Sequence, residues 1–230
     1  RITLSSSFGI TLTEEIARQW ADLTQGGILM EASYGLSETH TMDCFIPLHK
    51  IKYNVCGIPN AETDIRIFDF DDHTRELPIG EEGEIAVKTP SHFLGYWNKP
   101  EETKKTLVDG WVFTGDVGKF DEDGYLSFLG RRKEMIKVSG FSVFPEEVEL
   151  LLCKHPVIEQ AAVIPKPDPR KGEVIKAFII LRTGQSATAE EIRDWAKENM
   201  SSYKVPAVIE FVDSLPMSGA GKVLRRLLQP

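Results

Sequence analysis

The chain has 230 residues, and 27 Lys and Arg stand against 35 Asp and Glu, which gives a formal net charge of −8. Hydrophobic residues make up 41% and charged residues 27% of the chain, which excludes a disordered chain, a collagen-like chain and a disulfide scaffold. The acidic balance argues against a nucleic-acid partner, because an acidic chain repels phosphates unless its basic residues cluster. No apolar stretch of the sequence is long enough to span a membrane.

The cysteines and the first residue bear on where the protein works. Cys44, Cys56 and Cys153 form no CxxC motif, which favours reduced thiols and a cytoplasmic location. The sequence begins at Arg1, without Met and without a signal peptide. We therefore expect a piece of a longer cytoplasmic protein, and no pattern indicates an oligomeric state.

The first part of the chain is predicted to hold one helix, over residues 13–25, and then a buried strand over 28–30. From Gly57 to Leu129 short alternating or β-branched runs are separated by turn residues, and Asp121–Gly124 is typical of a hairpin turn. Strands are expected at 64–70, 83–88, 111–114, 118–121 and 125–129, with a short helix over 100–107.

The remainder of the chain has a different pattern. Helices are predicted over 145–154 and 189–200, and strands over 157–165, 175–182 and 209–212. Strands that alternate with helices indicate a small α/β unit. The predicted fold is therefore mixed α/β (α+β), with a β-rich domain over 1–130 and a smaller domain over 131–230.

Two segments carry residues that suit a nucleotide. Tyr34–Thr39 (YGLSET) offers a ring for a base, a close backbone approach, a hydroxyl for phosphate and the Glu38 carboxylate for Mg²⁺, although the hexapeptide alone favours an exposed turn. Asp116 follows Thr114-Gly115 at a predicted strand end, where an acid can bind ribose hydroxyls. A hairpin with turn acids is the alternative for this second segment.

Two further segments are basic. Four of the seven residues from Arg131 to Lys137 are basic, which is typical of a solvated face but also suits a hinge that faces phosphate. Gly219-Ala220-Gly221-Lys222 is a flexible loop that ends in Lys but lacks the spacing and the Ser/Thr of a Walker A loop. The five histidines have no metal-ligand spacing, so a zinc site is not expected.

Together and in this order, these segments resemble the adenylate-forming superfamily, which includes acyl-CoA synthetases, peptide-synthetase adenylation domains and beetle luciferases. FPEEVE (144–149) is similar to the version found in fatty-acid–CoA ligases. The matching segments are YGLSET (34–39), GIP (57–59), GEIAVKTPSHFLGY (83–96), GWVFTGD (110–116), DGYLSFLGRRKEMIKVSGFSVFPEEVE (123–149) and LPMSGAGKVLRR (215–226).

The resemblance implies a fold and an activity. Residues 1–130 would end a large adenylation domain in a distorted-barrel subdomain, and residues 131–230 would form its small mobile domain. The implied reaction joins a carboxylic acid, expected to be fatty, to AMP from ATP, and then transfers the acyl group to coenzyme A with the help of Mg²⁺. Small molecules are therefore the expected partners, and peripheral association with a membrane stays open.

The resemblance also implies roles for single residues. Tyr34 would stack on adenine, Ser37 would contact the α-phosphate, and Glu38 would ligate Mg²⁺. Asp116 would bind the ribose with Arg131 beside it, and Lys133 would be the hinge. Lys222 would serve adenylation, and Lys137 would serve thioester formation. Further nucleotide contacts are implied for Gly9, Ser33 and Gly35, and coenzyme A contacts for Ser139, Gly140 and Phe141.

Three departures from the family pattern leave alternatives. The Gly-rich phosphate loop is absent from this sequence, Ser7–Thr11 replaces the family's SGGAP, and MSGAGK replaces the usual T-P-x-G-K. The 230 residues alone are therefore expected to be inactive. A ligase that acylates a carrier protein, and a non-catalytic nucleotide-binding or interaction module with the same fold, are the two alternatives.

Overall fold

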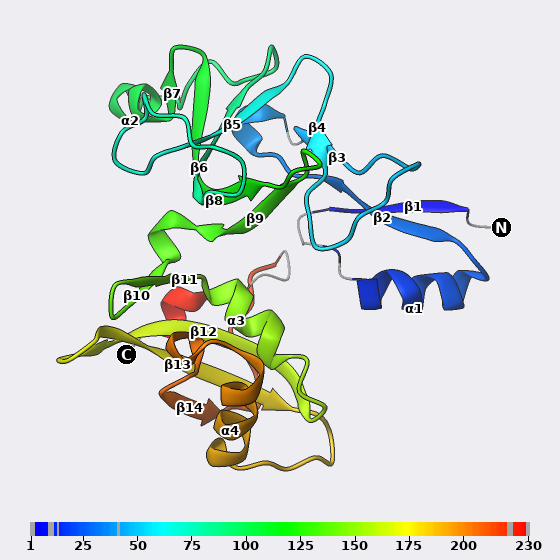
Figure 1. The fold of residues 1–230 in the computed structure, drawn as a ribbon, viewed down its shortest axis with the longest axis vertical. Coiled ribbons are helices and arrows are strands. Elements are labelled where there is room, and N and C mark those ends of the chain that lie inside the picture. The colour runs from blue at the N-terminus through cyan, green and yellow to red at the C-terminus, as the bar shows by residue number, and fades with distance from the viewer. Residues whose placement is uncertain (1–2, 9–11, 13, 41, 220–222, 229–230) are drawn as a thin grey trace. The chain divides into compact units, whose positions relative to one another are not determined.

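The computed structural model describes residues 3–8, 12, 14–40, 42–219 and 223–228. The chain divides into two compact units, Arg1–Arg132 and Lys133–Pro230. Helices and strands mix in both, as Figure 1 shows, which confirms the mixed α/β prediction.

The first unit begins with a strand–helix–strand motif. β1 (Leu4–Phe8) and β2 (Ile28–Ser33) pair in parallel, and α1 (Glu14–Thr24) connects them. The helix was predicted, whereas β1 was missed and β2 is longer than the predicted strand. Ligands of such α/β units bind at the carboxyl ends of parallel strands. Tyr34 directly follows the end of β2.

The rest of the first unit is an antiparallel sheet, strongly curled in Figure 1, with strand order β5-β6-β8-β7 and with β9 paired to β8. Its core contains Ile65, Ile67, Ile85, Val87 and Leu126, together with Tyr34. The bounds are β3 (Cys44–Phe45), β4 (Ile58–Pro59), β5 (Asp64–Phe68), β6 (Gly83–Lys88), α2 (Pro100–Thr106), β7 (Leu107–Val108), β8 (Trp111–Phe120) and β9 (Leu126–Arg131).

One expectation about this sheet was wrong. The sequence predicted two strands, over 111–114 and 118–121, where the structure has the continuous β8. The register explains the difference, because Ala86 pairs with Phe113 whereas Glu84 pairs with Val117. Thr114-Gly115-Asp116 therefore stands opposite Ile85 alone, as a bulge, and bulges are frequent beside active sites.

The predicted hairpin turn at Asp121–Gly124 is confirmed between β8 and β9. The Asp121 carboxylate accepts hydrogen bonds from the backbone N–H groups of Asp123 (3.0 Å) and Tyr125 (2.9 Å). Lys52 forms an ion pair with the same carboxylate. Asp121 therefore stabilises the turn between β8 and β9.

The second unit is a sheet in the order β11-β10-β13-β12, with β14 paired in parallel to β13. Its elements are β10 (Ile136–Val138), β11 (Phe141–Val143), α3 (Pro145–Leu152), β12 (Ile158–Asp168), β13 (Gly172–Leu181), α4 (Ala189–Asn199) and β14 (Val208–Phe211). Short 3₁₀ turns lie at Ser37–Thr39, Arg132–Glu134, Ser202–Lys204 and Arg225–Leu227.

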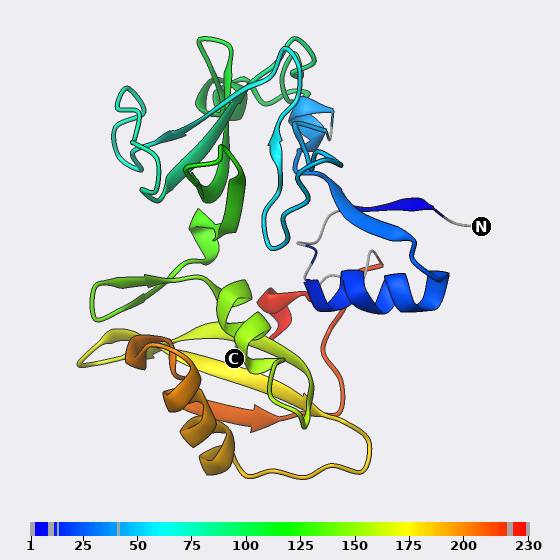
Figure 2. The ribbon, with the colours of Figure 1, turned by 45° about the vertical axis from the view of Figure 1, so that its right-hand side comes forward.

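Both faces of this second sheet are covered. Val163 and Ile175 pack on one face with Val148 of α3 and Ile192 of α4. The neighbouring Ile164 lies on the other face and packs with residues of the C-terminal segment. Figure 2 shows α4 beside the sheet. Because successive strand residues point to opposite faces, apolar residues on both faces give near-continuous hydrophobic runs.

An arginine near the C-terminus ties several elements of the second unit together. Arg225 donates from Nε and Nη2 to the Glu149 carboxylate of α3, at 2.9–3.2 Å, and its Nη1 lies 2.6 Å from Glu134 and 3.1 Å from Glu146. Met217 pairs with Val223 by a β-bridge, and the Leu224 N–H donates to the Pro216 carbonyl. The base of the loop between 217 and 223 is thereby fixed.

Candidate nucleotide site

Asp116 is the centre of the candidate site in the first unit. The bulge of β8 carries it, and only 2% of its surface is exposed. The Tyr34 hydroxyl donates to its Oδ2 at 2.9 Å, and the Arg131 Nε lies 2.7 Å from its Oδ1. Asp116 and Arg131 are cross-strand partners in β8 and β9. The structure places Arg131 beside Asp116, as the resemblance implied, and adds Tyr34 to this pair.

Tyr34 is buried, with 8% of its surface exposed, and its ring lies 6.3 Å from that of Phe128. The exposed turn that the hexapeptide alone favoured is therefore wrong for this residue. Burial, and then the nearby Asp116 charge, raise the pKa of the Tyr34 phenol well above its usual value. The hydroxyl consequently stays protonated and donates to Asp116 at neutral pH.

The Asp116 carboxylate is more deeply buried than the arginine that pairs with it. An ionised carboxylate offers about four lone-pair sites, so each of its oxygens can accept more than one hydrogen bond. The side chain of Arg131 is 42% exposed and that of Asp116 is 3% exposed. A carboxylate at this position has the chemistry to accept hydrogen bonds from the vicinal hydroxyls of a ribose.

Glu38 lies in the 3₁₀ turn that follows Tyr34 and is tied to a loop after β6. The Tyr96 hydroxyl donates to Glu38 Oε1, and the Phe93 N–H donates to the Glu38 carbonyl at 2.7 Å. Sequence reasoning assigned no role to Tyr96, although it lies in the 83–96 segment that carries the resemblance. Ser37 is exposed and Gly35 is half-buried in the same loop.

Glu38 is the residue of this loop that could contribute a ligand to Mg²⁺. Mg²⁺ is usually held by one or two carboxylates together with substrate phosphates, and seldom by a complete protein cage. Within the described ranges, no cluster of three or more His, Cys, Asp and Glu could hold a metal ion. Glu38 is half-buried beside the candidate nucleotide loop and offers hard oxygen ligands. It thus suits a metal ion that arrives with the nucleotide.

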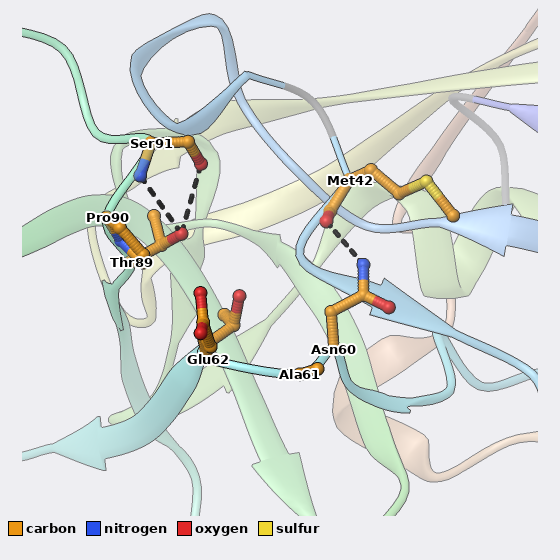
Figure 3. Close-up of a pocket in the computed structure, with 8 residues that line it drawn as sticks. Met42, Asn60, Ala61, Glu62, Thr89, Pro90 and Ser91 are labelled. Carbon is orange, nitrogen blue, oxygen red and sulfur yellow. Dashed lines mark hydrogen bonds between the residues drawn. The ribbon is translucent and has the colours of Figure 1, made fainter.

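The first unit also contains a pocket of about 470 Å³ (Figure 3). It is lined by Met42, Asn60, Ala61, Glu62, Thr63, Thr89, Pro90 and Ser91. Asn60 Nδ2 donates to the Met42 carbonyl at 2.7 Å, and the hydroxyls of Thr89 and Ser91 are 3.0 Å apart. His40 Nδ1 contacts the Ser91 carbonyl, so the pocket wall is joined to the Glu38 segment. No predicted site residue lines this pocket.

The first two residues of the predicted basic segment are partly exposed, and both are paired with acids. Arg131 is paired with Asp116, and Arg132 Nη2 lies 3.0 Å from Asp71. Lys133 is exposed, in the 3₁₀ turn at the start of the second unit. The two arginines are therefore held by acids of the first unit, while Lys133 is open to solvent.

The residues expected to serve thioester formation form one tight hairpin in the second unit. Val138 pairs with Phe141, so Ser139 and Gly140, with φ of 51° and 88°, are the two residues of the turn. Positive φ at both positions is the type I′ geometry that suits a two-residue hairpin. Lys137 Nζ lies 2.8 Å from Ser142 Oγ, and the Phe141 ring stacks on Tyr203 at 4.6 Å.

Gly9 and Lys222 lie outside the described residues, as do Ile10 and Thr11 of the unusual Ser7–Thr11 segment. The side chains of Phe8 and Ser33 are likewise not described. None of the helices in the described part of the chain combines the length and the apolar composition that crossing a bilayer requires.

Comparison with known proteins identifies the family. The profile of the "AMP-binding enzyme" family matches residues 1–97, and that of the "AMP-binding enzyme C-terminal domain" matches residues 147–222. The chain belongs to the AMP-binding, adenylate-forming enzyme family. The resemblance stated from the motifs is thereby confirmed.

Members of the AMP-binding family resemble the chain throughout. A long-chain-fatty-acid–CoA ligase of Escherichia coli O6:H1 is 37% identical over 98% of this chain. The fatty acid–[acyl-carrier-protein] ligase ScoC of Streptomyces coeruleorubidus is 38% identical over 85% of it. The chain spans 40% of the first relative and 38% of the second. ATP-bound MatB from Rhodopseudomonas palustris superposes with a TM-score of 0.87 at 31% identity, over 99% of this chain and 44% of MatB.

Proposed function

We propose that the protein containing this chain activates a fatty acid with ATP and transfers the acyl group to coenzyme A. The observation that carries the proposal is the buried Asp116, held between Tyr34 and Arg131 where β2 ends. The names of the relatives support a long-chain acid and coenzyme A, and the ATP in MatB supports the nucleotide.

The residues of the first unit suggest how the nucleotide is bound. Asp116 accepts hydrogen bonds from the ribose hydroxyls, while Arg131 turns from Asp116 toward phosphate. The Tyr34 ring contacts the base, and the Ser37 hydroxyl donates to the α-phosphate. Glu38 would hold Mg²⁺, whose positive charge opposes the repulsion between the substrate carboxylate and the phosphates.

The lysines of the second unit divide the two half-reactions between them. Attack of a carboxylate on a phosphate brings two anions together, and an ammonium group lowers that repulsion in the transition state. We assign this role to Lys222 and assign thioester formation to Lys137 and its hairpin. Lys133 is the hinge at which the second unit turns, so that Lys222 leaves the reacting phosphate group and Lys137 takes its place. Such a movement is needed because both half-reactions occur at the same phosphate.

The test is a pair of half-reactions measured with the complete protein. Acid-dependent exchange of pyrophosphate into ATP should occur and should fall at least about a hundredfold in Asp116→Ala. Acyl-CoA should then form when coenzyme A is added. A protein that binds ATP without exchange would instead be a non-catalytic nucleotide-binding module. Residues 1–230 alone should form no acyl-CoA, because this sequence has no Gly-rich phosphate loop.

A carrier-protein thiol is the second candidate acceptor. The name of the 38%-identical ScoC, a ligase for acyl carrier protein, favours it. Parallel assays with coenzyme A and with a phosphopantetheinylated carrier protein decide between the acceptors. Faster acylation of the carrier protein at equal thiol concentration would overturn the assignment to coenzyme A.

A further inference from the structure

Glu84 is a buried acid of the first unit that lies outside the predicted site. It belongs to β6, and 5% of its surface is exposed. A buried carboxylate is costly unless its oxygens find hydrogen-bond or charged partners. The partners that Glu84 binds therefore show which parts of the structure it holds in place.

Those partners come from three separate segments. Glu84 Oε1 accepts a hydrogen bond from the backbone N–H of Gly115 at 3.1 Å. Its Oε2 lies 3.2 Å from His73 Nε2 and 3.5 Å from Arg132 Nη1. The His73 ring in turn stacks on Phe113 at 4.0 Å, one residue before the bulge. One carboxylate thus joins the bulge, the loop before β6 and the end of the first unit.

The first of these contacts bears on the nucleotide site. Gly115 has a φ of 69°, in the left-handed region, and directly precedes Asp116. The Asp116 N–H donates to Thr114 Oγ1 at 3.0 Å, and Thr114 Oγ1 donates to the Ile85 carbonyl at 2.8 Å. The bulge that carries Asp116 is therefore fixed to β6 by two neighbouring residues, Glu84 and Ile85.

The second contact bears on the junction of the units. Arg132, the last residue of the first unit, donates to the Phe70 carbonyl at 2.6 Å as well as contacting Glu84 and Asp71. Its neighbour Arg131 pairs with Asp116. Two adjacent arginines thus bind two buried acids, Asp116 and Glu84, which belong to neighbouring strands.

We propose that Glu84 is a positioning residue for nucleotide binding. It holds the Gly115 amide so that the Asp116 carboxylate stays between Tyr34 and Arg131, and it fixes Arg132 at the start of the junction. The inference rests on the proposed function, which supplies ATP as the ligand. It adds a residue that touches neither the nucleotide nor the acid but determines where Asp116 lies.

The test compares Glu84→Ala and Glu84→Gln in the complete protein. The glutamine side chain would keep an oxygen for the Gly115 amide but lose the charge, whereas the alanine side chain would lose both. We expect Glu84→Ala to raise the KM for ATP in pyrophosphate exchange at least about tenfold, the scale of losing a hydrogen bond to a charged group. The KM for the acid should change by less than about twofold, and Glu84→Gln should restore most of the affinity for ATP.

A matched control and a second readout separate positioning from general stability. Glu82, two residues away, is an exposed glutamate that pairs with Lys119 at 3.0 Å, so Glu82→Ala should leave both KM values unchanged. Hydrogen exchange at the Gly115 amide should accelerate in Glu84→Ala but not in Glu82→Ala. If Glu84→Ala fails to fold, Glu84→Leu takes its place, since it also removes the acceptor of the Gly115 amide but fills the space of the side chain, and an unchanged KM for ATP in that variant overturns the proposal.

The possible outcomes distinguish the two proposals. Exchange by the unmodified protein, with the KM values for ATP and acid raised equally in Glu84→Ala, overturns the positioning role and leaves the function intact. No exchange by the unmodified protein overturns the function. Direct titration with ATP then still tests Glu84: at least about tenfold weaker binding in Glu84→Ala supports positioning, and unchanged binding overturns it.

Discussion

Arg225 donates hydrogen bonds from two of its nitrogens to the Glu149 carboxylate, and Glu149 Oε1 also accepts a hydrogen bond from the Val163 N–H at 2.7 Å. This pair connects the C-terminal segment, α3 and β12. Glu149 is largely buried, and burial raises the pKa of its carboxyl group although Arg225 opposes that rise. The free energy of unfolding of the second unit thus depends on this arginine.

Replacing Arg225 with Met is expected to destabilise the second unit by about 3 kcal/mol, because an unpaired carboxylate stays buried. Urea unfolding measures the loss. The adjacent Arg226 is exposed, so Arg226→Met should change the free energy of unfolding by less than about 0.5 kcal/mol. Equal effects of the two substitutions would contradict a specific role for the Arg225–Glu149 pair.

Asp43 should make stability depend on pH. Burial raises the pKa of this carboxyl from 3.8 to about 6, and a hydrogen bond from Thr39 opposes the rise only in part. Between these pH values the folded protein binds a proton that the unfolded chain does not, so stability falls as pH rises through the window. The expected loss is about 2 kcal/mol.

Asp43→Asn should flatten this pH profile and stabilise the protein at pH 7, since the amide carries no charge to bury. Urea unfolding at several pH values between 4 and 7 tests the expectation. Asp22→Asn, on the exposed surface of α1, is the control and should leave the profile unchanged. A profile that is equally steep with and without Asp43 would rule this residue out as the titrating group.

Gly57 of the GIP motif is required by packing. A Cβ at this position would lie 2.1 Å from the Phe45 carbonyl oxygen, and φ is 105°. Gly57→Ala should therefore destabilise the first unit by at least about 3 kcal/mol. Gly80 has φ of 89° with no atom within 4 Å of the added carbon, so Gly80→Ala reports backbone strain alone, about 1 kcal/mol. Similar thermal unfolding of the two variants would refute the steric explanation.

Tyr96→Phe should weaken the use of Mg²⁺. The Tyr96 hydroxyl holds Glu38, so its loss frees the carboxylate to rotate. We expect the Mg²⁺ concentration for half-maximal pyrophosphate exchange to rise about fivefold, with the KM for the acid unchanged. Tyr53→Phe, at a half-buried tyrosine outside this contact, is the control. An unchanged Mg²⁺ dependence would argue that Glu38 binds no metal.

The two lysines should fail in opposite half-reactions. Lys222→Ala should lower adenylate formation by about two to four orders of magnitude and should largely spare the reaction of supplied acyl-adenylate with coenzyme A. Lys137→Ala should show the reverse bias. Rapid-quench kinetics on each half-reaction, with melting curves to exclude misfolding, provide the measurement. Normal pyrophosphate exchange in Lys222→Ala would remove that lysine from the mechanism.

Elements with a strong local signal could be predicted from the sequence. The helix expected over 189–200 is α4, and the Thr188 cap with Glu191 three residues later fixes its start. The two- and three-residue strands β3, β4, β7, β10 and β11 were missed, because so few residues show no periodicity. The apparent break after Thr114 was a bulge, which local pattern does not distinguish from the end of a strand.

The candidate site shows the same limit. Motif order identified Tyr34, Asp116 and Arg131, but the hydrogen bond between Tyr34 and Asp116 joins residues 82 positions apart. Such a contact depends on how β2 packs against the curled sheet, and no pattern in the sequence near either residue indicates it. Glu84 was missed for a related reason, since a glutamate in a strand is normally taken to face solvent, and burial became evident only in the fold.

The bulge of β8 has a consequence for insertions and deletions. It adds two residues opposite β6, and because side chains alternate with a period of two, Val117 keeps the orientation that Gly115 would have in a regular ladder. Insertion or deletion of an even number of residues at this bulge therefore preserves the packing of the remaining strand. Removal of one residue would invert every side chain from there to Phe120. Natural and engineered length variants should accordingly differ here by two residues, while single-residue variants should fail to fold.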